Sequence, residues 1–271
     1  MDIRSVEPDL AIPKLETGQP DIGKRVKQTI PDYEQTGVYH VTYLPTDWVK
    51  GKRYPVLIEY AGNNYRGAYG DISTGRPEGS NMGYGISGGR GFIWVCLPYL
   101  NATGDNIALT WWGDSKNRTA RPTLDYCHKT VPWICEKYGG DTDRVILCGF
   151  SRGAIACNYL GLHDDETAKL WRAFIPYSHY DGIATWPYSA SDRDSALTRL
   201  KRLAKRPQFI CHEITGSQFN LAATKKWIES SNIKANLTFT ETGFRNHNDA
   251  WLLRTSPARE HLRAWLKRVL Q

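Results

Sequence analysis

The stretch RVILCGFSRGAIACNYL, residues 144–160, decides the fold of this chain. It opens with an apolar run over 144–150, which is typical of a strand buried on both faces. It closes with small and apolar residues over 154–160, which favour a helix. Between them lies the pattern GxSxG at Gly149–Gly153, whose small residues allow the backbone to turn sharply. A serine held between a strand and a helix in this way is typical of a nucleophile elbow, which lifts the hydroxyl clear of the sheet.

Strands and helices alternate on both sides of this stretch. Short apolar runs predict buried strands at 55–60, 92–99, 173–177 and 208–213, a weaker strand at 237–240, and an antiparallel strand over 37–44. Helices are predicted over 124–138, 154–160 and 222–228, with a last helix that starts near Ser256-Pro257. The alternation predicts an α/β protein with a mostly parallel central sheet and helices on both faces. We expect residues 1–36 to form an N-terminal extension and residues 37–271 a single domain.

Composition excludes several classes of protein. The 271 residues are 41% hydrophobic and 23% charged, which excludes a disordered or collagen-like chain. The longest apolar run, Phe92–Leu97, is far shorter than the roughly 18 residues that cross a bilayer, so we expect no membrane segment. The first residues form no secretory signal, which leaves a cytoplasmic protein or one whose signal has been removed. The net charge of +7 comes from scattered Lys and Arg, so no nucleic-acid partner is expected.

The cysteines do not resemble a metal site. None of the six belongs to a CxxC pair or has the spacing of zinc ligands, so we expect buried free thiols, although an even count also permits disulfides. We predict no metal and no cofactor.

A catalytic serine needs an imidazole to accept its proton and a carboxylate to orient that imidazole. Among seven histidines, His247 is favoured because it lies in a polar loop between the last predicted strand and the terminal helix. In this architecture such a loop brings a base to the carboxyl edge of the sheet. For the acid, Glu213 at the end of the 208–213 strand is preferred, and Asp181, one strand earlier, is the alternative. Asp249 ranks third because it is only two residues from His247.

Acyl transfer also needs hydrogen-bond donors for the oxyanion, each worth about 3 kcal/mol. One expected donor is the backbone N–H of Arg152, directly after Ser151. The other is the backbone N–H of Asn63, in the loop that follows the 55–60 strand. Gly62 in that loop permits close approach of the backbone.

The elbow at 149–153, the Ala61-Gly62-Asn63 loop and the His247 loop together resemble the α/β-hydrolase superfamily, in particular its feruloyl esterases, acetylxylan esterases and polyhydroxybutyrate depolymerases. The resemblance covers about residues 37 to 270. It implies a three-layer fold and a Ser-His-acid triad. The chain departs from this branch at Ala61, where the branch usually has a histidine, and after Glu213, where a common aspartate is absent.

Aromatic residues near strand ends indicate the substrate. Trp111, Trp112 and Trp186 are candidates for contacts with sugar rings or aromatic acyl groups. Arg152 has two interpretations: it pairs with a substrate carboxylate such as a uronate, or it forms a structural ion pair. We therefore expect a serine carboxylesterase that acts on small-molecule or polysaccharide esters carrying acetyl, feruloyl or uronate groups. The alternatives are a polyester depolymerase, a serine peptidase or amidase of the same fold, and a non-catalytic hydrolase-like binding protein.

Overall fold

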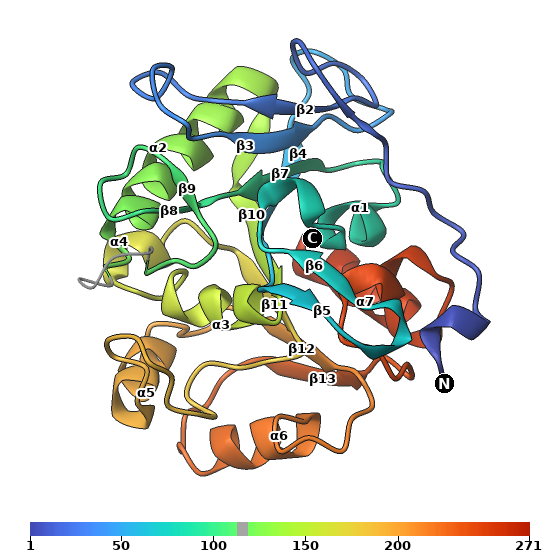
Figure 1. Ribbon diagram of the computed structural model, residues 1–271, viewed down its shortest axis with the longest axis vertical. Coiled ribbons are helices and arrows are strands. Elements are labelled where there is room, and N and C mark those ends of the chain that lie inside the picture. The colour runs from blue at the N-terminus through green and yellow to red at the C-terminus, as the bar shows by residue number, and fades with distance from the viewer. Residues whose placement is uncertain (113–118) are drawn as a thin grey trace.

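A nine-stranded sheet forms the centre of the protein (Figure 1). The computed structural model describes residues 1–112 and 119–271. In spatial order the strands are β1 (Leu15–Glu16), β2 (Arg25–Gln28), β3 (His40–Tyr43), β7 (Ile93–Leu97), β4 (Tyr54–Tyr60), β10 (Gly140–Phe150), β11 (Ala173–Tyr177), β12 (Gln208–His212) and β13 (Leu237–Glu241). The last six strands in this order pair in parallel, whereas β3 pairs antiparallel with both β2 and β7.

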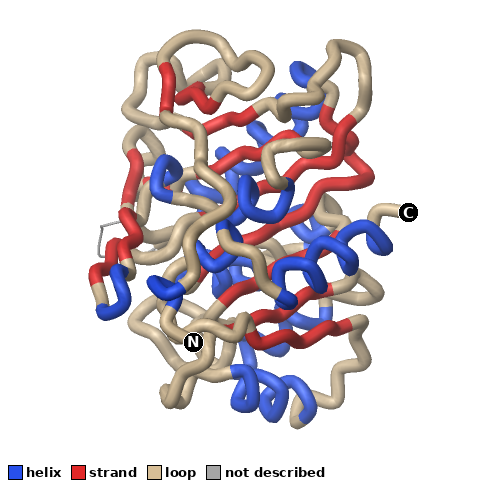
Figure 2. The backbone as a smooth tube through the Cα atoms, turned by 90° about the vertical axis from the view of Figure 1, so that its right-hand side faces the viewer, coloured by secondary structure: helices blue, strands red, loops and turns tan. Residues whose placement is uncertain are grey.

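Helices cover both faces of this sheet, as Figure 2 shows from the side. Apolar side chains of α1 (Met82–Ser87) and α7 (Pro257–Val269) pack on one face. On the other face pack α2 (Arg121–Tyr138), α3 (Arg152–Tyr159), α4 (Asp165–Ala168), α5 (Arg193–Lys201) and α6 (Leu221–Glu229). Short 3-10 helices are η1 (Ile3–Ser5), η2 (Ala68–Gly70), η3 (Pro77–Gly79) and η4 (Asp249–Leu253). The predicted mostly parallel, three-layer α/β architecture is confirmed.

Local signals set the ends of the predicted helices. The hydroxyl oxygen of Ser256 accepts a hydrogen bond from the Arg259 N–H at 3.2 Å and caps α7, with Pro257 in the first turn. Helix α2 ends at Gly139, whose φ of 76° is left-handed and suits glycine. The helix over 124–138 therefore begins three residues earlier than predicted and ends where its stop signal lies.

Several elements were not predicted from the sequence. Strands β1 and β2 belong to residues 1–36 and extend the sheet at one edge. Helices α1 and α5 lie in segments for which the sequence predicts no helix. Two small hairpins, β5 (Asn64–Arg66) with β6 (Ile72–Thr74) and β8 (Tyr99–Leu100) with β9 (Ile107–Ala108), lie outside the main sheet.

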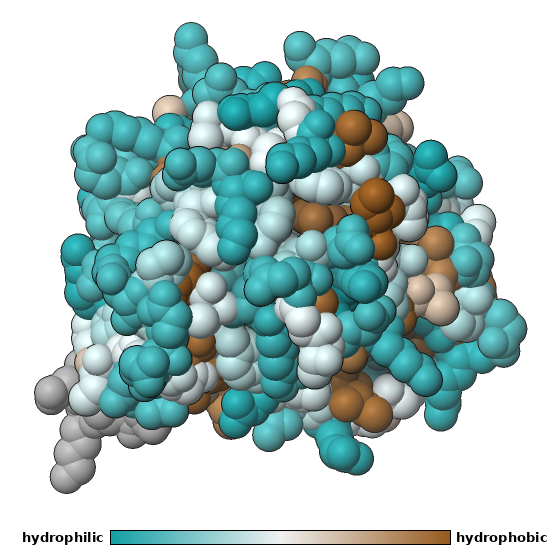
Figure 3. Space-filling view, turned by 90° about the horizontal axis from the view of Figure 1, so that it is seen from above, coloured by the Kyte–Doolittle hydropathy of each residue, from teal (hydrophilic) through white to brown (hydrophobic). Residues whose placement is uncertain are grey.

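The cysteines lie in the interior of the protein, and the surface seen in Figure 3 is mostly hydrophilic. All six cysteines are buried and free, and burial raises the pKa of each thiol. Seen from above, hydrophobic residues appear only as separated patches on a mostly hydrophilic face (Figure 3). Within the described ranges, none of the helices has the length and apolar character that a bilayer crossing requires.

A buried carboxylate holds α1 against the sheet. Glu59 on β4 is 1% exposed, and its two oxygens accept hydrogen bonds from the backbone N–H groups of Met82 and Gly83 at 3.0 and 2.9 Å. Its Oε2 also accepts from the indole of Trp94 at 2.8 Å. Burial, together with the nearby carboxylate of Asp249, raises the pKa of Glu59 to about 7.

This raised pKa predicts a stability that depends on pH. The folded protein keeps the Glu59 proton up to about pH 7, whereas the ordinary value is 4.5. The free energy of unfolding should therefore fall as the pH rises from 4.5 to 7, because the folded state there binds more protons than the unfolded state. Urea unfolding across this range should show a shallower fall for Glu59→Gln than for the wild type. The exposed Glu229→Gln serves as control, and an equal slope in Glu59→Gln and the wild type would refute the prediction.

Candidate active site

Ser151 lies on a strained bend between β10 and α3. Its backbone angles, φ of 53° and ψ of −111°, lie outside the regions that residues other than glycine ordinarily occupy. The two glycines of the pattern permit the bend by the absence of a side chain. A Cβ on Gly149 would overlap the backbone of Gly153, and a Cβ on Gly153 would overlap the carbonyl oxygen of Tyr60. The GxSxG spacing is therefore required by close backbone packing at this turn.

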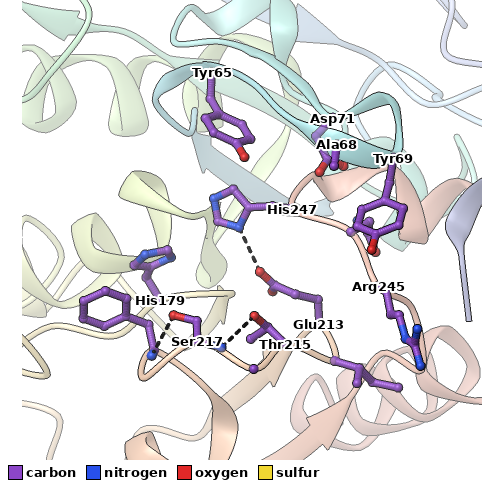
Figure 4. A pocket seen from close by; sticks show the side chains of 14 residues that line it. Tyr65, Ala68, Tyr69, Asp71, His179, Glu213, Thr215, Ser217, Arg245 and His247 are labelled. Carbon is purple, nitrogen blue, oxygen red and sulfur yellow. Dashed lines mark hydrogen bonds and ion pairs between the residues drawn. The ribbon is translucent and has the colours of Figure 1, made fainter.

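The structure brings three of the predicted residues together. The Oγ of Ser151 lies 3.1 Å from Nε2 of His247. Nδ1 of His247 lies 2.8 Å from Oε1 of Glu213, a contact drawn in Figure 4. Glu213 directly follows β12, and His247 lies in the loop between β13 and η4. Parallel strands end at the same edge of the sheet, which is why segments far apart in sequence meet here. The arrangement has the geometry of a nucleophile, a base and an orienting acid.

The two other candidate acids have different partners. Asp181 is 2% exposed, and Arg199 donates to its two carboxylate oxygens at 2.8 and 3.0 Å. Asp249 accepts from the backbone N–H of Asn81 at 3.0 Å and also from its side-chain amide. Glu213, not Asp181 or Asp249, therefore contacts the imidazole of His247.

Ser178 is a site residue that was not predicted from the sequence. It follows β11, it is 1% exposed, and its φ of 81° is left-handed. Its hydroxyl donates to Oε1 of Glu213 at 2.8 Å and lies 3.1 Å from Nδ1 of His247. Its place just beyond the 173–177 strand was visible in the sequence, but the inward turn of its side chain follows from a backbone conformation that the sequence does not indicate.

A hydrogen bond from Asn248 and two aromatic rings fix the position of the His247 loop. The side-chain amide of Asn248 donates to Asp71 on the β5–β6 hairpin at 2.6 Å, and burial raises the pKa of that Asp71 carboxyl. Tyr65, from the same hairpin, meets the imidazole edge to face with ring centroids 5.3 Å apart (Figure 4). Phe150 contacts the imidazole at 4.8 Å. The hairpin and the elbow together fix the orientation of His247.

The two expected oxyanion donors lie at the start of α3 and in the loop after β4. Arg152 is the first residue of α3, so its backbone N–H has no acceptor within the helix. Its side-chain Nε donates to Oδ1 of Asn63 at 2.9 Å, which joins the helix start to this loop. A Cβ on Gly62 would overlap the ring of Phe150, so glycine is needed for the loop to approach the elbow.

The predicted tryptophans differ in exposure. The structure contradicts a substrate contact for Trp111, because its indole is fully buried and packs against the rings of Tyr99, Tyr159 and Tyr188. The sequence does not predict this burial, because polar residues follow Trp111 and Trp112. Trp112 and Trp186 are half-buried, and both contact the guanidinium of Arg152.

An open cavity of about 650 Å³ lies beside His247 and Glu213. Its walls combine exposed aromatic and aliphatic side chains with polar ones: Tyr65, Ala68, Tyr69, Asp71, His179, Ile214, Thr215, Gly216, Ser217, Phe219, Arg245 and Asn246. Burial and the neighbouring His247 lower the pKa of His179 to about 3, so His179 is neutral at physiological pH. Among residues 1–112 and 119–271, no three His, Cys, Asp or Glu side chains are grouped as metal ligands.

Three solved structures are similar to this chain. A Bacteroides ovatus protein described as a dipeptidyl aminopeptidase IV has a TM-score of 0.55 and 14% identity over 90% of this chain and 35% of its own. A thermostable esterase has a TM-score of 0.54 and 16% identity over 90% of this chain and 62% of its own. An S-formylglutathione hydrolase from Agrobacterium tumefaciens has a TM-score of 0.59 and 13% identity over 90% of this chain and 94% of its own.

These likenesses concern the fold. The chain spans about a third of the peptidase, less than two thirds of the esterase and nearly all of the S-formylglutathione hydrolase. No protein-family model and no curated protein matches the sequence. Together with the sheet order and the two helical layers, the solved structures identify the architecture of this chain as the three-layer α/β-hydrolase fold.

Proposed function

We propose that this protein is a serine hydrolase that cleaves carboxylic esters through an acyl-enzyme. The observation that carries the proposal is the hydrogen-bonded chain from Ser151 through His247 to Glu213, which begins on a strained turn. Strain of this kind persists only where the surrounding structure enforces it, and it is concentrated at active sites.

In the proposed reaction, Ser151 Oγ attacks the acyl carbon while Nε2 of His247 takes the hydroxyl proton. Glu213 accepts the Nδ1–H and stabilises the imidazolium that forms. The backbone N–H groups of Arg152 and Asn63 donate to the oxyanion. His247 then gives its proton to the leaving alcohol, and the ester bond breaks. A water molecule, deprotonated by His247, releases the acid and restores Ser151.

We propose carbohydrate esters as the substrates. Tyr65 and Tyr69 are about 40% exposed at the edge of an open cavity, where their rings can stack on a sugar while polar groups stay hydrated. An open cleft of this kind also admits a polymer chain. Acetylated, feruloylated and uronate-methylated xylo-oligosaccharides are therefore the first substrates to measure.

Comparison of an ester with an amide tests the proposed chemistry. We expect the protein to hydrolyse 4-nitrophenyl acetate and at least one acylated xylo-oligosaccharide, and to leave a peptide 4-nitroanilide intact. A fluorophosphonate probe should label Ser151, as peptide mapping would detect. Cleavage of the anilide alone would favour a peptidase, hydrolysis of polyhydroxybutyrate in place of the saccharides would favour a depolymerase, and no turnover or labelling would favour a binding protein.

Ser178 is proposed as a positioning residue, and a pair of variants tests this role. Ser178→Ala removes the hydroxyl and keeps the left-handed backbone, whereas Ser178→Gly removes both the hydroxyl and the strain. Loss of a hydrogen bond to the Glu213 carboxylate should lower kcat about tenfold in both variants with KM unchanged. The glycine variant should be the more stable of the two by about 1 kcal/mol. If kcat instead follows stability, the role of Ser178 is structural.

A further inference from the structure

The guanidinium of Arg152 lies in an aromatic cage directly beside the proposed nucleophile. Its central carbon is 4.7 Å from the ring centroid of Trp112, 5.3 Å from that of Trp186 and 5.7 Å from that of Trp111. Asn63 accepts from Nε at 2.9 Å, which fixes the plane of the group. The two terminal nitrogens are thus left to other partners.

The positive charge in this cage has no counter-ion among the described residues. The ion pairs of that part of the chain do not include Arg152, and the nearby Arg199 is already paired with Asp181. The Nη1 atom of Arg152 is buried and has no hydrogen-bond partner among residues 1–112 and 119–271. Burial lowers the pKa of Arg152, since its charge is partly withdrawn from water. An unpaired buried donor on a cation costs free energy unless a ligand supplies an acceptor.

The cage is continuous with the active site. Trp186 contacts His179, with ring centroids 6.3 Å apart, and His179 contacts His247 at 5.4 Å. Phe219, which lines the cavity beside His247, lies 5.8 Å from Trp186. Trp186 therefore lies between the cavity wall at Phe219 and the guanidinium of Arg152.

We propose that Arg152, held by Asn63 between Trp112 and Trp186, is a subsite for a carboxylate carried by the ester substrate. The planar guanidinium fork matches a carboxylate in two parallel hydrogen bonds, and one guanidinium balances the single carboxylate charge. The net charge of +7 favours the approach of an anion. This inference rests on the proposed esterase function, and it makes Arg152 the residue that selects acidic over neutral esters.

Two substrate pairs test the subsite from either side of the ester bond. Phenyl acetate and 3-acetoxybenzoate differ by a carboxylate on the alcohol part, and 4-nitrophenyl hexanoate and 4-nitrophenyl hydrogen adipate differ by one on the acyl part. One charge-assisted hydrogen bond predicts a preference of about tenfold or more in kcat/KM for the acidic member of at least one pair. The ratio should fall to about one in Arg152→Gln, and Arg152→Lys should keep part of it.

Arg245→Gln is the matched control, because Arg245 is an exposed cation on the wall of the cavity. It should leave the ratio unchanged. In the wild type, benzoate should inhibit more strongly than benzamide, a result that does not depend on any variant. The subsite would be overturned if the preference for the acidic ester were below fivefold in both pairs. It would also be overturned if that preference survived in Arg152→Gln or was lost in Arg245→Gln. If neutral esters are hydrolysed without this preference, the subsite alone fails; if no ester is hydrolysed above the Ser151→Ala background, the proposed function fails.

Discussion

Ser151→Ala is expected to lower kcat/KM for 4-nitrophenyl acetate by about a millionfold, because removal of a triad nucleophile leaves only the residual effect of the oxyanion donors. The substitution removes one oxygen atom from a side chain that is 6% exposed, so the fold should be retained. Circular dichroism and the urea midpoint should both match the wild type.

Ser217→Ala provides the control for this experiment. Ser217 lines the cavity, and its hydroxyl oxygen accepts from the backbone N–H of Phe219 in its own loop. It should retain turnover within a fewfold of the wild type. If Ser151→Ala keeps more than about one hundredth of the wild-type rate, another nucleophile is acting, since triad serines account for far more than this.

Glu213→Gln should lower kcat about ten-thousandfold, as expected for an acid that fixes the tautomer of a catalytic histidine. A carboxylate accepts the proton on Nδ1 of His247, which leaves Nε2 unprotonated and ready to accept the proton of Ser151. A glutamine amide can donate to Nδ1 and shift the proton to Nε2. The imidazole would then lose its function as a base. Steady-state rates on a short-chain ester measure the loss.

Asp181→Asn is the matched carboxylate-to-amide control, and we expect it to lower stability and not turnover. Turnover should remain near the wild-type rate, whereas the free energy of unfolding should fall by about 3 kcal/mol because the buried Arg199 loses its counter-ion. Urea unfolding and ester hydrolysis on the same samples separate the two effects. A catalytic loss in Asp181→Asn together with normal turnover in Glu213→Gln would assign the acid to Asp181.

Much of this fold follows from local sequence because the central strands are buried on both faces. The runs at 144–150, 173–177 and 208–212 are mostly apolar, so each is predictable from its own residues. The elbow is predictable for a related reason, because the GxSxG pattern is local, although Gly153 is required by its approach to the distant Tyr60 carbonyl. The positions of Glu213 and His247 followed from the rule that parallel strands end at one edge.

The missed features depend on contacts between distant segments. Helix α1 lies in a glycine-rich stretch and is capped by Glu59, which is 23 residues away, so no local pattern predicts it. Strand β2 is short and partly polar, and its pairing with β3 defines it. The burial of Trp111 and the inward turn of Ser178 likewise depend on packing that a sequence read alone does not show. Helix α5 is an exception, because Asp192 was a visible N-cap signal.

Because all six cysteines are buried, their reaction with a thiol-reactive dye can measure local unfolding of the protein. Only the thiolate attacks a thiol-reactive dye. The six thiols are buried and their pKa values are raised, so none of them reacts readily in the native core. Dye incorporation then requires a segment to separate from the sheet. Mass spectrometry can give the rate of dye incorporation at each cysteine in the strands β7, β10 and β12 and in the helices α2 and α3. These rates would measure how often each part of the domain opens.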